Sequence, residues 1–344
     1  MKKCIVCAVL LAGGITTPAD EISLQSAPPV VIKTVPAAGS TSVDPGLMEL
    51  RVTFSKPMQD GSWSWTTFGE DSFPEITGKI HYLEDGRTCV APVKLEPGKF
   101  YATWLNTDSY QNFKDTNGTP AVPYLLTFKT AGANAEGESK PAAAVASKDE
   151  SPNDSLLNEQ QRLVLQWTER QFRGFFDRRT FDGWSEKERA DLESKLLDTL
   201  KGPQTREYYQ ALSTLAALRS QKAVQPLLSI SADRAEKDNR DRWMAIRALG
   251  IIGDKSVVPE LIHLTYHGNI NTRWWAQISL VRLTGKNFGY DWKAWGQWWN
   301  AQSGQPAFQE DFVVWYRDEA WSDPAKLPQT LAQADEKFFA DLKK

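Results

Sequence analysis

The sequence predicts two folded regions of different class, an antiparallel β-sandwich and a short α-solenoid, joined by a flexible linker. Over residues 28–130, short runs of β-branched and aromatic residues alternate with Gly, Pro and Asp turns. Residues 131–155 are mostly small or charged, and from residue 156 onward apolar residues recur at helical spacing. The length of 344 residues agrees with this division, since a domain has roughly 150 residues.

The composition excludes several classes of protein. Hydrophobic residues make up 41% of the chain and charged residues 24%, which is typical of a folded protein and not of a disordered one. A net charge of −3 argues against nucleic acid as the partner, because such binders neutralise phosphates with an excess of Lys and Arg. The chain shows neither a P-loop nor a dinucleotide fingerprint, so we expect no cofactor.

The first nineteen residues have the pattern of a secretory signal. Met1-Lys2-Lys3 is followed by an apolar run over residues 4–15, and Thr17 and Ala19 are small residues at the −3 and −1 positions of a cut before Asp20. The apolar run is too short to span a bilayer as a stable helix. We therefore expect a periplasmic, cell-surface or secreted protein with no transmembrane segment after cleavage. A retained membrane anchor is the alternative.

The β region contains several predicted strands. Residues 49–54 alternate polar and apolar, as a half-buried strand does. Asp85-Gly86 is a hairpin turn between the runs at 79–83 and 87–90. Cys89 falls in the second run and is the only cysteine left after signal cleavage, so we expect a buried, inert thiol and no disulfide. Further strands are predicted at residues 100–105 and 124–129.

Parts of this region resemble the bacterial Ig-like domains of S-layer and other envelope proteins. The matching parts are the entry at residues 35–44, the stretch at 52–58, the turn at 114–118 and the close at 126–130. The resemblance implies an Ig-like sandwich that serves as an interaction module. Trp63 and Trp65 depart from it, because they lie where a loop is expected. Both lie on one face of an extended segment, which makes them candidate partner-binding residues.

An internal repeat defines the helical region, residues 156–305. The pattern at 211–218 recurs at 245–252, an offset of 34 residues, and a shorter third copy begins at Ala276. Helical hairpins of this length bury their apolar faces by stacking on one another. The pattern resembles HEAT repeats, including Gly253–Pro259, in which Asp254 would cap a helix. Three to four units are expected. Upstream, Ser185 and Glu188 form a predicted capping box.

The helical region contains one possible metal-binding pair. His263 and His267 are four residues apart on a predicted helix, and Glu260 lies one turn earlier. Leu264 stands where a zinc peptidase has its general base, and His81 belongs to the β region. We therefore interpret His263 and His267 as a solvated or inter-repeat pair and expect no metal.

Tryptophan is abundant, with 14 residues, and several gather in the last repeat. Trp292, Trp295, Trp298 and Trp299 line one face of a predicted helix. They either seal the last repeat, which has no following neighbour, or form a recognition surface. The candidate partner-binding residues are Arg273, Trp274, Trp275, Trp298, Trp299, Trp63 and Trp65.

The sequence contains no recognisable catalytic constellation. We therefore expect an exported, non-catalytic binding or scaffold protein whose partner is a protein or an envelope polymer. One alternative is a hydrolase of envelope polysaccharide or peptide, which requires a deep pocket with two carboxylates. Another is a carbohydrate-binding protein that uses exposed Trp. The tail at 306–344 is expected to carry a short helix, either folded back on the array or bound to a partner.

Overall fold

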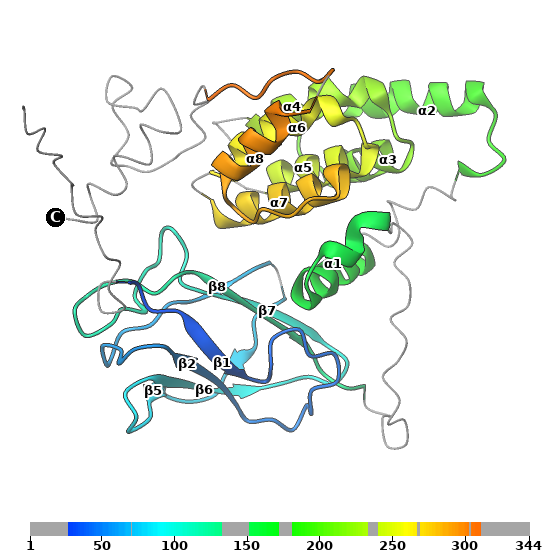
Figure 1. Cartoon of the computed structure of the whole chain (residues 1–344). Helices are drawn as coiled ribbons and strands as arrows, with labels where there is room; N and C mark the ends of the chain where they lie inside the picture. Colours follow the sequence, from blue (N-terminus) through cyan, green and yellow to red (C-terminus); the bar gives the residue numbers. More distant parts are fainter. Residues whose placement is uncertain are drawn as a thin grey trace, which may run out of the picture.

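The structure is a computed structural model that describes residues 27–69, 71–132, 151–171, 181–232, 240–266, 269–302 and 304–310. A β part comes first in the chain and a helical part second, as the sequence predicts (Figure 1). The predicted signal, most of the predicted linker and the tail beyond residue 310 lie outside the described residues. Among the helices that are described, none is long and apolar enough to cross a membrane.

The β part is a sandwich of two antiparallel sheets. One sheet has the strand order β1-β2-β6-β4, with β5 also paired to β6, and the other has the order β3-β7-β8. The prediction of a half-buried strand at 49–54 is confirmed, because its burial alternates along β2. The strands are β1 (Val31–Val35), β2 (Glu49–Phe54), β3 (Trp65–Thr67), β4 (Glu75–Ile76), β5 (His81–Tyr82), β6 (Thr88–Lys94), β7 (Phe100–Leu105) and β8 (Tyr124–Lys129).

Strand β7 is buried along its whole length because both of its faces are covered. Tyr101 and Leu105 belong to the apolar clusters between the two sheets. Phe100, Ala102 and Trp104 belong instead to the core of the helical part. The outer face of β7 is therefore part of the core of the helical part, so the sandwich and the helices are in direct contact in addition to the predicted linker.

The helices form two rows, with α3, α5 and α7 in one and α4, α6 and α8 in the other (Figure 1). Along the chain the pairs α3–α4, α5–α6 and α7–α8 repeat. Within the described residues the array is held by contacts of α5 with α3, α4 and α7 and of α6 with α7 and α8. The helices are α1 (Glu159–Gln171), α2 (Glu186–Thr199), α3 (Arg206–Ala217), α4 (Val224–Ala232), α5 (Arg240–Ile252), α6 (Val258–Leu264), α7 (Ile270–Thr284) and α8 (Trp292–Asn300).

The repeat read from the sequence is a structural repeat. The first unit has a 3₁₀ turn η3 (Gln221–Ala223) before α4, and the second has η4 (Lys255–Val257) before α6, 34 residues later. Ser220 caps η3 and Asp254 caps η4 through side-chain acceptors. The capping role predicted for Asp254 is confirmed, at the turn that leads into α6. The two matched stretches therefore fold alike.

The predicted linker is too long at its C-terminal end. Residues 151–155 are ordered in the 3₁₀ helix η1 (Pro152–Leu156), which begins at a capping box between Ser151 and Asp154. The Asp154 carboxylate accepts two hydrogen bonds from Arg282 of α7, at 2.9 and 2.8 Å. This buried ion pair fixes η1 against the last unit, which explains why the segment is structured despite its polar composition.

Candidate functional site

Aromatic side chains from both parts of the chain meet where the sandwich contacts the helices. Phe68 lies 5.7 Å from Trp274 and 6.3 Å from Trp167, measured between ring centroids. Trp167 stacks on Phe100 of β7 at 5.0 Å. We call Phe68, Phe100, Trp104, Trp167 and Trp274 the aromatic junction. Rings in tilted and edge-to-face contact give a directional attachment in addition to the area that they bury.

Polar contacts fix the orientation of this junction. The indole Nε1 of Trp104 donates to Oδ1 of Asn271 at 2.8 Å. Nη2 of Arg273 lies 2.9 Å from Oδ1 of Asp108, and both side chains are largely buried. Burial raises the pKa of Asp108, and the nearby Arg273 guanidinium opposes part of that rise. Arg273, predicted as a partner-binding residue, thus contacts the sandwich of its own chain.

The candidate tryptophans of the helical part are mostly inaccessible. The exposed fraction is 4% for Trp274, 2% for Trp275 and 2% for Trp299. Trp299 donates through Nε1 to the carbonyl of Pro306 at 2.8 Å, so residues beyond α8 cover this face. Trp298 is half-buried. Other parts of the chain cover Trp274, Trp275 and Trp299, which agrees with the alternative that tryptophans seal the last repeat. Their role in partner binding stays a prediction.

The two tryptophans of the β part are half-buried and pack against the sandwich core. Trp65 opens β3 and lies 5.8 Å from the ring of Phe113, edge to face. Trp63 packs against the same apolar cluster, in agreement with the prediction that both share a face. Both side chains pack on the sandwich core and are only partly accessible.

The histidine pair is incomplete in the described residues. His263 is buried beside Phe308, with ring centroids 4.8 Å apart, and His267 lies outside the described residues. His81 is exposed on β5, in the other part of the chain. The described residues hold no group of three or more His, Cys, Asp or Glu side chains suited to a metal ion. Cys89 is buried as predicted, and burial raises the pKa of its thiol to about 12.

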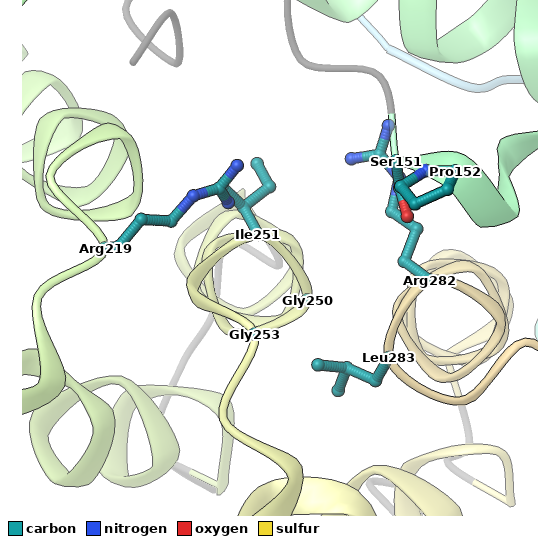
Figure 2. Close-up of a pocket in the computed structure, with 8 residues that line it drawn as sticks. All are labelled: Ser151, Pro152, Arg219, Gly250, Ile251, Gly253, Arg282 and Leu283. Carbon is teal, nitrogen blue, oxygen red and sulfur yellow. The ribbon is translucent and has the colours of Figure 1, made fainter.

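A pocket of about 200 Å³ opens where helices of the three units end next to η1 (Figure 2). Figure 2 shows the guanidinium of Arg219 extending over Ile251 from one side, while Arg282 rises from the opposite side behind Ser151. We call this the arginine pocket. Its described lining residues are Ser151, Pro152, Arg219, Gly250, Ile251, Gly253, Arg282 and Leu283.

Arg219 has an unusual backbone conformation. Its φ is +56°, in the left-handed region that glycine adopts more easily than other residues. Gly253 follows α5 at the equivalent position, 34 residues later, with φ +90°, and Gly285 ends α7 with φ +69°. Our sequence reasoning missed Arg219. Extending the repeat alignment by one residue past the helix would have placed Arg219 opposite Gly253.

A second pocket, of about 250 Å³, lies between the sandwich and α1 and is lined in part by Phe100, Trp167 and Asp71. Asp71 is the one carboxylate among its described lining residues, and the arginine pocket has none. Neither pocket therefore brings together two described carboxylates, as the predicted alternative of a polysaccharide hydrolase requires.

Comparison with known families supports both resemblances. Residues 25–130 match the bacterial Ig-like domain family, and residues 193–281 match the HEAT repeat family. No curated protein matches the chain. The two matched stretches contain the sandwich and most of the helical units, respectively. The chain therefore carries a bacterial Ig-like domain followed by HEAT repeats.

Proposed function

We propose that this is an exported, non-catalytic interaction protein in which the Ig-like domain and the HEAT repeats act as one binding body. HEAT repeats and Ig-like domains are interaction modules, which supports protein binding as the general role. The observation that carries the proposal is the core shared through β7, because it fixes the repeat surface relative to the sandwich. A preorganised surface loses less entropy when it binds a partner than two loosely tethered domains do.

Export is part of the proposal. Residues 1–19 have the basic, apolar and small-residue pattern of a cleaved signal. Bacterial Ig-like domains are typically extracellular or surface domains. Cell fractionation of the expressed full chain, with mass spectrometry of the mature N-terminus, tests this. We expect a mature protein that begins at Asp20 in the periplasmic or surface fraction. Recovery of the uncleaved chain from the cytoplasm would contradict export.

Binding is tested with the mature chain immobilised on a support and exposed to cell-envelope extract under cross-linking conditions. We expect one protein to be recovered in a fixed ratio, and to bind again after purification. The control is the same chain after heat denaturation. Failure to recover a partner, together with turnover of a small substrate by the purified chain, would replace the proposal with an enzymatic one.

The structure gives less support to carbohydrate binding through exposed tryptophans. Trp275 stacks on Trp243 at 5.3 Å, and Trp274 makes an edge-to-face contact with Phe68 at 5.7 Å. A sugar ring needs an open aromatic face, and these faces are covered.

A further inference from the structure

We propose that the surface where α6 meets α8 is a peptide-binding site, which residues 304–310 of this chain occupy until a segment of a protein partner displaces them. The partner segment presents an aromatic side chain on extended backbone. This inference rests on the proposed function and adds to it the place where the partner binds and the chemistry that it presents. We call this surface the Phe308 site, and its residues are His263, Trp292, Gly296, Trp299 and Asn300.

Side chains of α8 hold the backbone of the segment that occupies the site. Oδ1 of Asn300 accepts a hydrogen bond from the N–H of Phe308 at 2.7 Å, and Nδ2 of Asn300 donates to the carbonyl of Phe308 at 3.1 Å. Two hydrogen bonds to the N–H and carbonyl of one residue are also what a neighbouring strand makes with extended backbone. Trp299 donates through Nε1 to the carbonyl of Pro306 at 2.8 Å. All three bonds reach backbone groups, so they do not depend on which chain supplies the segment.

The site also selects an aromatic side chain. The ring of Phe308 lies 4.8 Å from that of His263 and 6.3 Å from that of Trp292, measured between ring centroids. The ring rests on Gly296 so closely that a Cβ at this glycine would lie 2.6 Å from Cδ1 of Phe308. Glycine is unfavourable in the middle of a helix, because it loses more backbone freedom on folding than other residues do. Here it leaves the space that the ring requires.

The chain's own segment is attached through few contacts. Phe308 is the one buried residue of 304–310, and the other six are exposed. All seven lie outside helices and strands. A segment with so few buried contacts opens locally at a lower cost than global unfolding. Helix α8 keeps a separate attachment when the segment leaves, because the ring of Trp295 packs edge to face on Phe288 at 4.9 Å.

The segment that fills the site in the structure identifies the class of ligand. The site recognises a backbone N–H, two backbone carbonyls and an aromatic ring, a combination that a peptide offers and a glycan does not. Helix α8 ends at Asn300 and the segment begins at Gly304, so the connection between them is short. A short connection gives an effective concentration on the order of millimolar. A partner therefore competes with the chain's own segment, and its binding strengthens when that segment is weakened.

The test measures, by anisotropy, how a fluorescently labelled peptide with the sequence of residues 304–310 binds to the mature full chain. Phe308→Ala removes the ring that fills the site, and this variant should bind the peptide at least about tenfold more tightly than wild type does. A peptide with Ala in place of Phe should not bind. Adding Asn300→Ala to Phe308→Ala should abolish binding, because the backbone contacts are lost. Adding Gln297→Ala, at an exposed position of α8, is the matched control and should leave binding unchanged.

A measurement on wild type keeps the test decisive if Phe308→Ala fails to fold. Asn300 accepts the hydrogen bond from the N–H of Phe308, so hydrogen exchange at this amide reports whether the chain's own segment is bound. Excess unlabelled peptide should speed up this exchange, because it displaces the segment. The peptide with Ala in place of Phe should have no effect. Unchanged exchange with both peptides would overturn the site.

The outcomes separate this inference from the proposed function. Equal affinity of wild type and Phe308→Ala for the peptide, with unchanged circular dichroism, would overturn the site. If both proteins recover the partner from envelope extract equally and the peptide does not displace it, the interaction role stands and this site is wrong. A wild-type dimer that dissociates in Phe308→Ala would mean that a second copy supplies the segment, which overturns the assignment to another protein. If no partner is recovered but the peptide still requires Asn300, the site stands and the proposed function fails.

Discussion

The two ends of the described helical array, α2 and α7, differ sharply in burial. Helix α2, at the start, has no buried residue, whereas α7 buries twelve of its fifteen residues. Within the described part of the chain, α2 packs chiefly on α3. Helix α7 packs on α5, on α6 and on η1. Burial in this array therefore depends on which segments cover a unit, and the helix sequence alone does not determine it.

The difference extends to single equivalent positions. A residue with positive φ follows each of α3, α5 and α7, namely Arg219, Gly253 and Gly285. The residues three positions earlier are Ala216, Gly250 and Arg282. Gly250 lies where α7 presses on α5, so closely that a Cβ would be 2.9 Å from the Cα of Ser279. Arg282 occupies the same place in α7, where η1 packs and the Asp154 carboxylate accepts a hydrogen bond from Arg282. The close contact between α5 and α7 therefore requires glycine at position 250. At the equivalent position of α7, Arg282 forms an ion pair with Asp154 instead.

The largest expected effect is the loss of the ion pair that seals the end of the array. Asp154→Ala leaves the buried Arg282 guanidinium without its carboxylate, and the free energy of unfolding should fall by about 3–5 kcal/mol. Urea denaturation followed by circular dichroism measures this change. The matched control is Lys201→Ala, which removes the exposed pair with Asp198 and should cost no more than about 1 kcal/mol. Similar losses of unfolding free energy in both variants would mean that the Asp154–Arg282 ion pair does not stabilise this end of the array.

A smaller effect is expected at the close contact inside the array. Gly250→Ala brings a methyl group against the backbone of Ser279, whose Oγ donates to the Ile246 carbonyl at 2.9 Å. The free energy of unfolding should fall by about 1–3 kcal/mol, because α5 and α7 must separate. Thermal unfolding measures it.

The reverse change in the first unit serves as the control. Ala216→Gly should cost about 1 kcal/mol or less through helix propensity, with an additional loss for the buried methyl group. If Gly250→Ala stabilised the protein, as alanine normally does in a helix, the close contact would be contradicted.

Local patterns were sufficient to predict most of the fold. Alternation predicted β2, Asp85-Gly86 predicted the turn between β5 and β6, and the 34-residue offset predicted units that fold alike. Each of these signals depends on residues close in sequence or on a repeated spacing. The capping boxes of α2 and η1 are equally local, but only the first was recognised, because Ser151 and Asp154 lie in a stretch of polar composition.

The contacts between the two parts of the chain could not be predicted in the same way. Whether Trp274 is exposed depends on Phe68, two hundred residues earlier in the chain, and no periodicity reports that pairing. One signal was available. Strand β7 has the sequence Phe-Tyr-Ala-Thr-Trp-Leu, with no regular polar position, and such runs are typical of strands covered on both faces. The left-handed backbone at Arg219 was missed because only comparison with Gly253, the residue at the equivalent position, indicates it.

The smallest expected effect concerns pH at the junction. Burial raises the pKa of Asp108 in the folded state, so the folded protein binds the carboxyl proton more tightly than the unfolded chain does. The contribution of Asp108 to stability is therefore full below its ordinary pKa of about 4 and decreases as pH rises through the raised value. Asp108→Asn removes this titration. The stability of the variant relative to wild type should increase from acidic to neutral pH, as measured by urea denaturation at each pH. If the stability of the two proteins changes in parallel with pH, burial does not raise the pKa of Asp108. If the variant instead loses stability relative to wild type toward neutral pH, the ion pair with Arg273 outweighs burial.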